Sequence, residues 1–529
     1  MGEAFGRMMR LCHQHALKTS FLAGCLASLS LPPAYVMPAF LLMGWVFYQA
    51  AIAPNWRQSC LHITLGAYGW FLSSLYWISH SLLVGEAEFW FLIPVSFFGI
   101  PVIVTAFWAV GGMVGYRLAG TAIGRLVMMA VMIGLLEWGR EFIATGFPWN
   151  APGLIFLGLN ITASWAAVFG QTGLNFIALF AAIIAPFYSL SRGLVRRQLA
   201  GMIMTCFIAI SLVILGLASY SHQQMSPLNP ADEAHGIRLV QPAVPQADKW
   251  VREMRAAHMD RLTSLSIAEA SQPIDLVIWP ETAFAGDYRS EGALVDARAA
   301  MIADFHRQQQ GQQQGQQQGG AGQLLSGILR FDADNQVRNS ALLIAEDGTK
   351  ALYDKTHLVP FGEYVPWRFI PFIDAIAGPR DFTKGAEVRP LFVPNFGLVL
   401  PLICYEAIFP QLAGRARERP SLIVNVTNDG WFGHTAGPYQ HLAQTRMTAI
   451  SYGIAVVRVA NGGISAVFDG KGARIASLGL GEQGFVDTAK PATYRATLFA
   501  RLSFLINSSL LIVLLMLAIG LDRLGKRRQ

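Results

Sequence analysis

The sequence predicts a mixed α/β domain inserted between transmembrane α-helices. Of its 529 residues, 53% are hydrophobic and only 14% are charged, whereas soluble domains carry about 25% charged residues on average. The charges are also unevenly distributed, because residues 19–220 and 501–522 contain few of them while residues 225–500 resemble an ordinary globular domain. This order indicates a membrane domain, a soluble domain and a final membrane anchor.

Eight apolar segments are predicted to cross the membrane, for which a helix needs about 20 mostly apolar residues. They are residues 19–31, 34–53, 61–84, 89–116, 126–145, 171–190, 198–219 and 501–522. The first is short and ends at Pro32-Pro33. Residues 152–170 are apolar but interrupted by glycines, so we interpret them as a re-entrant or interfacial stretch.

The basic residues predict the orientation, because Lys and Arg in short loops stay on the cytoplasmic side. Alternate loops contain Arg7, Arg10, Lys18, Arg57, Arg117, Arg125, Arg192, Arg196, Arg197 and the tail "RLGKRRQ". The loops between them are poorer in basic residues and carry Glu86, Glu88 and Glu141. Eight spans then place both termini in the cytoplasm. The expected domains are 1–220 with seven helices, 221–500 outside, and 501–529 with the eighth helix and a basic tail. The net charge of +7 is explained by topology, and no nucleic-acid partner is expected.

The domain at 221–500 contains strand-like runs with helix-like segments between several of them. The runs are 236–244, 274–283, 323–331, 339–348, 398–409, 421–432 and 453–470, and the helical segments include 246–271 and 290–309. This pattern is typical of a mixed α/β fold whose strands are buried on at least one face. The glutamine- and glycine-rich residues 307–323 cannot bury much apolar surface and are predicted to form a flexible surface loop.

Cys404 is the only cysteine in this domain, so it cannot form a disulfide within it. It is either a small buried hydrophobic residue or a nucleophile. A nucleophile needs a base and a group that stabilises an anion. Glu281 ends the string "VIWPE" and Lys355 lies in "YDKTHLVPFGEYVP", eight residues before Glu363. Glu281 can act as the base and Lys355 can stabilise an oxyanion, provided that three strands bring the residues to one edge of a sheet.

The chain resembles the nitrilase superfamily, and within it the apolipoprotein N-acyltransferase family. The strings that carry the resemblance are "WPETAF", "KTHLVPFGEYVP", "LICYE" and "NVTNDGWFG", on a domain preceded by seven apolar spans and followed by one. The resemblance implies an αββα sandwich on eight membrane helices, with no cofactor and no metal. It also implies catalytic roles for Glu281, Lys355 and Cys404, and supporting roles for Glu363, Tyr405, Glu406, Trp250 and Asn339.

The implied reaction is the last step of bacterial lipoprotein maturation, in the inner membrane with the catalytic domain in the periplasm. Cys404 takes an acyl chain from a phospholipid as a thioester. The α-amino group of the N-terminal diacylglyceryl-cysteine of an apolipoprotein then attacks the thioester and becomes an amide. A monomer is expected. The aromatic segments 431–433 and 365–372 are either a lid that dips toward the membrane or part of the domain core.

Two other functions are compatible with the same catalytic residues and apolar spans. A membrane-tethered amidase or nitrilase would employ the same Glu, Lys and Cys with water as the second nucleophile. A transporter or receptor would carry the soluble domain as a module, but the spans contain few charges apart from Glu137 and Arg140. The arrangement of seven spans and one favours the acyltransferase.

Overall fold

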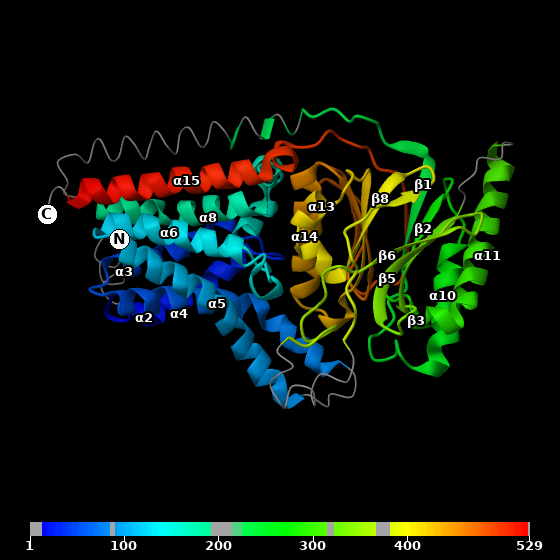
Figure 1. The fold of residues 1–529 in the computed structure, drawn as a ribbon, viewed down its shortest axis with the longest axis horizontal. Coiled ribbons are helices and arrows are strands. Elements are labelled where there is room, and N and C mark those ends of the chain that lie inside the picture. The colour runs from blue at the N-terminus through cyan, green and yellow to red at the C-terminus, as the bar shows by residue number, and fades with distance from the viewer. Residues whose placement is uncertain are drawn as a thin grey trace, which may run out of the picture. The chain divides into compact units, whose positions relative to one another are not determined.

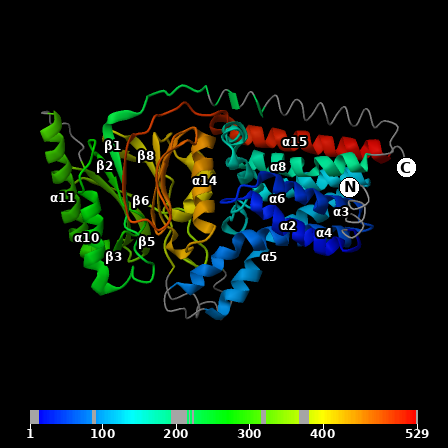
Figure 2. The same ribbon diagram turned by 180° about the vertical axis from the view of Figure 1, so that it is seen from behind.

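The structure is a computed structural model that describes residues 13–84, 90–191, 215–216, 219–220, 222, 224–314, 322–366 and 381–526. The chain divides into two compact units. One is formed by residues within 1–82, 89–224 and 501–529, and the other by residues within 83–88 and 225–500. The first is helical and the second contains two β-sheets (Figures 1 and 2).

The helical unit is built from long α-helices joined by short 3₁₀ turns. Its helices are α2 (Ala16–Ala27), η1 (Ser28–Ser30), η2 (Met37–Leu42), α3 (Met43–Ile52), α4 (Trp56–Leu75), η3 (Tyr76–Leu83), η4 (Trp90–Leu92), α5 (Ile93–Leu118), α6 (Ala122–Gly139), η5 (Ile143–Thr145), η6 (Pro152–Gly158), α7 (Asn160–Ala163), α8 (Ala166–Leu190) and α15 (Leu498–Lys526). Helix α4 packs against α2 and α5, and α6 packs against α5 and α8. Glycines allow close packing, since a Cβ on Gly115 would lie 2.5 Å from the Met129 Cα.

Within the described residues, four helices are long and apolar enough to cross a membrane: Trp90–Leu118, Ala122–Gly139, Ala166–Leu190 and Leu498–Lys526. The predicted spans at 19–31 and 34–53 fall on shorter apolar helices. The span predicted at 61–84 falls on α4, which ends at Leu75 and continues as a 3₁₀ turn. Most of the span predicted at 198–219 lies outside the described residues. A total of eight spans therefore stays a prediction.

Two predicted boundaries in this unit differ from the structure. The span predicted to reach residue 145 ends as an α-helix at Gly139, and the positive φ angles of Ala144, Thr145 and Gly146 prevent the α-helix from resuming there. The glycine-interrupted stretch at 152–170 contains the short helices η6 and α7, and Gly170 breaks the start of α8 with φ 59° and ψ −174°.

The charged pair near the end of α6 is buried and hydrogen-bonded to its surroundings. Arg140 Nη2 donates to Glu137 Oε2 at 2.6 Å, and its Nη1 donates to the carbonyl oxygens of Phe147 and Trp149. Trp108 Nε1 donates to the other Glu137 oxygen at 2.6 Å. These contacts tie the end of α6 to the following loop, which is a structural role for the pair.

The second unit contains two sheets packed face to face. The first sheet has the order β13 (Gly484–Lys490), β1 (Asp232–Gln241), β2 (Leu276–Ile278), β4 (Gln323–Phe331), β5 (Val337–Ile344), β6 (Lys350–Asp354), with β3 (Phe284–Asp287) paired to β4. The second has the order β12 (Arg474–Leu478), β11 (Ser465–Phe468), β10 (Ala455–Asn461), β9 (Leu422–Asn428), β8 (Gly397–Ile403), β7 (Leu391–Val393). Strands β1, β2 and β4 run parallel, as do β8, β9 and β10.

Helices cover the outer face of each sheet, which completes the expected αββα sandwich. Helices α10 (Arg255–Ser266) and α11 (Tyr288–Gln314) lie on the first sheet, and α14 (Gly437–Tyr452) lies on the second with α13 (Gln411–Arg415) (Figure 1). Strands β9 and β10 are buried at every position, which agrees with their largely apolar sequences. A core of fifteen buried residues, with Trp279 and Val295 among them, joins α10 and α11 to the first sheet.

The predicted loop at 307–323 is wrong in its first part. Helix α11 continues to Gln314 and β4 begins at Gln323, while residues 315–321 lie outside the described residues. Glutamine is a good helix former. Arg307 is paired with Glu346 at 2.6 Å, and Gln310 Nε2 donates to Asp275 Oδ1 at 2.9 Å. These contacts anchor a segment whose composition alone suggests a loop.

Candidate active site

The three residues with predicted catalytic roles follow strands of both sheets, not of one. Glu281 follows β2 and Lys355 follows β6. Strand β5 is antiparallel to β4 and to β6, so β2 and β6 run in the same direction and end at the same edge of the first sheet. Cys404 follows β8 of the second sheet, and β8 contacts β5 across the sandwich. The site therefore lies between the two sheets.

Two carboxylates, an amide and an ammonium group form a connected cluster. Lys355 Nζ lies 2.9 Å from Glu363 Oε1 and 3.7 Å from Glu281 Oε1. Asn339 Nδ2 donates to both carboxylates, at 2.8 Å to Glu281 and 2.9 Å to Glu363. The second oxygen of Glu363 accepts from the Val359 backbone at 2.8 Å. Four of the predicted site residues are thus held in contact by hydrogen bonds and ion pairs.

Cys404 sits at a sharp turn between β8 and the 3₁₀ helix η8 (Cys404–Ile408). Its φ of +48° is unusual for a residue with a side chain. Burial and the charge of Glu281 raise the pKa of the Cys404 thiol to about 12, against the opposing charge of Lys355. The thiol is therefore protonated at neutral pH in the resting site, and it becomes a nucleophile only if a base takes its proton as it reacts.

The Lys355 ammonium group is buried with 1% of its side chain exposed. Burial alone would lower the pKa of Lys355, but the charges of Glu363 and Glu281 raise it above its ordinary value. Lys355 is therefore a fixed positive charge that electrostatically influences the Cys404 thiol. Such a group can stabilise a negative oxygen in a low-dielectric site.

Glu406 does not share the face of Cys404, because the turn begins at the cysteine and the strand geometry ends there. Instead, its buried carboxylate accepts five hydrogen bonds. They come from the backbone N–H groups of Ile403, Thr356 and His357 and from the hydroxyls of Thr356 and Tyr353. Glu406 thereby joins the end of β8 to the segment just after Lys355, which fixes the two strand ends relative to each other.

Comparisons with known proteins identify the family of the chain. A family model described as carbon-nitrogen hydrolase matches residues 236–497, and one described as apolipoprotein N-acyltransferase N-terminal domain matches residues 23–184. The apolipoprotein N-acyltransferase of Brucella melitensis is 32% identical over 548 residues, which cover 99% of this chain and 98% of the relative. The chain belongs to the apolipoprotein N-acyltransferase family.

One more relative and one solved structure illustrate the range of the matches. The apolipoprotein N-acyltransferase of Rhodopseudomonas palustris is 32% identical over 522 residues, which cover 94% of each chain. Among solved structures, an amidase from Nesterenkonia sp. matches 50% of this chain and 94% of its own at 20% identity, with a TM-score of 0.35. As a member of the apolipoprotein N-acyltransferase family, the chain is an enzyme that transfers acyl groups to nitrogen.

The remaining predicted residues of the family site differ in exposure. Tyr405 is buried and packs edge-on against Phe409, which in turn lies 3.9 Å from the His357 ring. Trp250 is 45% exposed, and Val251 and Met254 beside it are exposed as well. Trp250 therefore belongs to an apolar surface, whereas Tyr405 belongs to the packing behind the cysteine.

The two segments predicted as a lid or as core are only partly described. Trp431 is 41% exposed, so its side chain does not belong to the core. Val365 is buried, and residues 367–372 lie outside the described residues. A lid role for either segment stays a hypothesis.

A buried charged group behind Cys404 was missed by sequence reasoning. Asp429 is held by Arg458 at 2.5 Å and by His441 at 2.9 Å, and the other ring nitrogen of His441 lies 3.0 Å from the Cys404 carbonyl oxygen. Burial alone would raise the pKa of Asp429, but the charges of Arg458 and His441 lower it to about 2. Asp429 lies within the "NVTNDGWFG" string, which was the one available signal.

Proposed function

We propose that the protein transfers an acyl chain from a phospholipid to the α-amino group of the N-terminal diacylglyceryl-cysteine of apolipoproteins. The family name does not specify the phospholipid donor, the acceptor amino group or the covalent intermediate, and these three are proposed here. The observation that carries it is the buried cluster of Glu281, Lys355 and Glu363 beside the strained turn of Cys404. A base, a fixed cation and a thiol are the groups that acyl transfer through a thioester requires.

In the first half-reaction, the Cys404 sulfur attacks the ester carbonyl carbon of the phospholipid while its proton passes to Glu281. The tetrahedral oxyanion is stabilised by Lys355. The C–O bond to the glycerol breaks, the proton on Glu281 passes to the leaving oxygen, and a lysophospholipid departs. The raised pKa of the Cys404 thiol means that proton transfer accompanies attack, because the resting site holds very little thiolate.

In the second half-reaction, the neutral α-amino group attacks the thioester carbonyl carbon. Its proton passes to Glu281 and then to the departing Cys404 sulfur, so an amide and a free thiol are formed. Glu363 and Asn339 orient Lys355 and Glu281 through the hydrogen bonds of the cluster. Trp250 is exposed and offers an apolar surface to a lipid substrate.

The same proposal includes the placement of the enzyme in the inner membrane as a monomer. Residues 1–220 carry seven spans, 221–500 form the periplasmic catalytic domain, and 501–529 contain the eighth span and a cytoplasmic tail. Reporter fusions after Gln529 and within residues 315–321 should report opposite sides of the membrane. Reports from the same side would contradict the topology.

The direct test of the function uses purified protein, phospholipid and a synthetic peptide with an N-terminal diacylglyceryl-cysteine. Mass spectrometry should detect the peptide with one added acyl chain, and the product should be absent with the Cys404→Ala variant. The carbon-nitrogen hydrolase match to residues 236–497 favours one alternative, a membrane-tethered amidase. Release of free fatty acid or ammonia without any N-acylated peptide would support that alternative and refute the transfer.

A further inference from the structure

A second lysine, Lys249, is buried behind the Glu281 turn. Its Nζ donates to the Glu281 carbonyl oxygen at 3.1 Å and to the Thr282 hydroxyl at 2.7 Å. In one of the two orientations of its amide, Asn428 offers a third acceptor at 3.1 Å. An ammonium group has three protons to donate, so these acceptors satisfy Lys249 completely. The residue is therefore held in one position and does not need a substrate as a partner.

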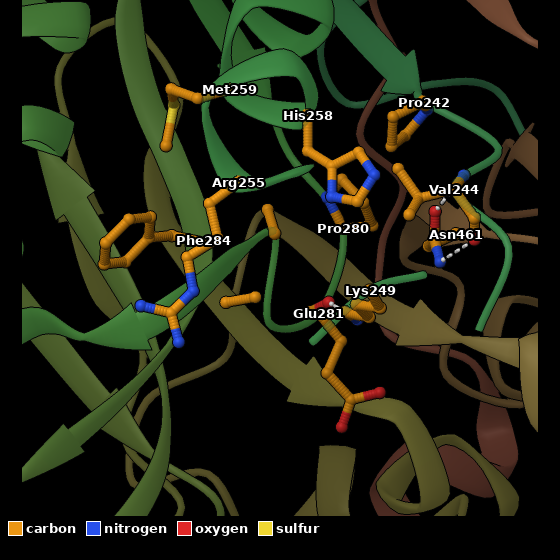
Figure 3. Close-up of a pocket in the computed structure, with 12 residues that line it drawn as sticks. Pro242, Val244, Lys249, Arg255, His258, Met259, Pro280, Glu281, Phe284 and Asn461 are labelled. Atoms are coloured by element: carbon orange, nitrogen blue, oxygen red, sulfur yellow. Dashed lines mark hydrogen bonds between the residues drawn. The ribbon is translucent and has the colours of Figure 1, made fainter. Parts of the chain in front are cut away.

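The cavity that Lys249 lines is not a substrate site. It has a volume of about 20 Å³ and is also lined by Arg255, His258, Phe284 and Asn461. This volume accommodates a water molecule but no acyl chain. In Figure 3, Lys249 meets the backbone of Glu281, while the Glu281 carboxylate points away from the other labelled residues. Lys249 therefore contacts the backbone of Glu281 on the side away from its carboxylate.

Two features show that the Glu281 turn needs a support of this kind. Thr282 has a φ of +43°, which is strained for a β-branched residue. The hydrogen bonds from Lys249 Nζ fall on both residues of the turn, Glu281 and Thr282. The direction of the Glu281 carboxylate therefore depends on a backbone conformation that Lys249 holds.

Lys249 adds a second positive charge beside the carboxylates of the buried cluster. Glu281 and Glu363 are two carboxylates, and Lys355 supplies one positive charge to them. Lys249 supplies the second, and it interacts electrostatically with both Glu281 and Cys404. Burial lowers the pKa of Lys249 to about 8 against the opposing effect of Glu281 and Cys404, so the group still carries its proton at pH 7. Without it, thiolate formation would occur in a site that already has an excess negative charge.

We propose that Lys249 is a positioning residue of the active site, which holds the Glu281 turn and supplies the second positive charge that stabilises the Cys404 thiolate. The inference rests on the proposed function, because it assigns Cys404 as the nucleophile and Glu281 as the base. Its consequence can nevertheless be measured without any lipid substrate.

The test measures how fast iodoacetamide alkylates Cys404 at pH 7.5 in the full-length protein in detergent, by mass spectrometry of the Cys404 peptide. We expect Lys249→Met to slow alkylation about tenfold, since raising a thiol pKa by one unit removes nine-tenths of the thiolate. Lys249→Arg keeps the charge and should remain within threefold of the wild type. Lys249→Gln keeps a hydrogen-bond donor but not the charge and should be as slow as Lys249→Met. The control variant Lys350→Met removes an exposed lysine that is paired with Asp296, and it should leave the alkylation rate of Cys404 unchanged.

Loosening of the turn alone would expose Cys404 and speed its alkylation, so slower alkylation reports the loss of the positive charge. Alkylation of Lys249→Met at or above the wild-type rate, or full recovery by Lys249→Gln, would overturn the inference. If Lys249→Met does not fold, the alkylation rates of Lys249→Gln and Lys249→Arg are compared instead. Equal rates for these two variants would overturn the inference. A wild-type protein that never carries an acyl group on Cys404 would refute the proposed function instead, whatever the alkylation rates.

Discussion

His441 Nε2 donates to the carbonyl oxygen of Cys404 at 3.0 Å, and it does so from a site with no solvent exposure. A carbonyl oxygen only accepts, so Nε2 carries a proton. The other ring nitrogen lies 2.9 Å from Asp429, which Arg458 holds at 2.5 Å. The strained backbone of Cys404 is therefore held, through His441, by the buried ion pair of Asp429 and Arg458. These residues orient the thiol without contacting it.

This relationship predicts a large effect of Arg458→Met on stability. The substitution leaves the Asp429 carboxylate buried without its guanidinium partner, which typically costs about 3–5 kcal/mol of unfolding free energy. Thermal and denaturant unfolding of the purified protein would measure the loss. The double variant Asp429→Asn/Arg458→Met removes both charges and should recover most of it. A double variant as unstable as the single one would show that the unpaired charge is not the cause.

Asn339 should tolerate loss of its side chain better than conversion to a carboxylate. Asn339→Ala removes one donor that Glu281 and Glu363 share, which should slow acylation of Cys404 about tenfold or more. Asn339→Asp is nearly isosteric but places a third negative charge beside these carboxylates and opposes thiolate formation. Single-turnover acylation with phospholipid should therefore be slower for Asn339→Asp than for Asn339→Ala. The reverse order would contradict the charge argument.

Glu406→Gln should reduce stability and catalysis together. Burial raises the pKa of Glu406, and the hydrogen bonds from Ile403 and Thr356 oppose that effect. A glutamine amide can accept on one atom only, so its nitrogen must face a backbone or hydroxyl donor. An unsatisfied buried donor costs about 1–3 kcal/mol. A lower thermal midpoint with a lower acylation rate is expected, whereas an unchanged midpoint with reduced activity would indicate direct participation in the chemistry.

The lowered pKa of His306 predicts that the catalytic unit loses stability in acid. It is buried, it contacts the Ser266 carbonyl oxygen through Nε2 at 2.9 Å, and burial lowers its pKa from 6.5 to about 4. Between pH 6.5 and 4 the unfolded chain binds a proton that the folded chain does not, so stability falls as the pH falls through this window. The full loss is about 3 kcal/mol. His306→Gln should flatten this part of the profile of unfolding free energy against pH, and an unchanged slope would exclude His306 as the origin.

Much of the fold follows from local sequence patterns. The predicted strands at 323–331 and 421–432 correspond to β4 and β9, because buried parallel strands appear as continuous apolar runs. Strand β6 was missed since its sequence "KALYD" has only three apolar residues between two charged ones and lies at an edge of the sheet. Strand β12 is also an edge strand and mostly exposed, so it has little apolar sequence to reveal it.

Glu281 and Cys404 could be predicted from the residues because each follows an apolar run, and Lys355 from the string "YDKTHLVPFGEYVP". The supporting roles of Glu363, Tyr405, Glu406, Trp250 and Asn339 came from the family resemblance. Lys249, Arg458 and His441 act through tertiary contacts. Lys249 contacts Glu281 from 32 positions away in the chain, Arg458 contacts Asp429 from 29, and His441 contacts Cys404 from 37. No local pattern marks such residues. The site also lies between two sheets, and the sequence of a single strand does not show how the two sheets pack against each other.

The central claim is tested most directly by incubating the full-length protein with phospholipid and no acceptor, followed by mass spectrometry of the Cys404 peptide. The account predicts one acyl chain on Cys404, removed by neutral hydroxylamine as a thioester is. The adduct should be absent in Cys404→Ala, present in the matched variant Cys60→Ala, and formed more slowly in Glu281→Gln. A wild-type protein that makes N-acylated peptide but never carries a hydroxylamine-labile acyl group on Cys404 would contradict the account.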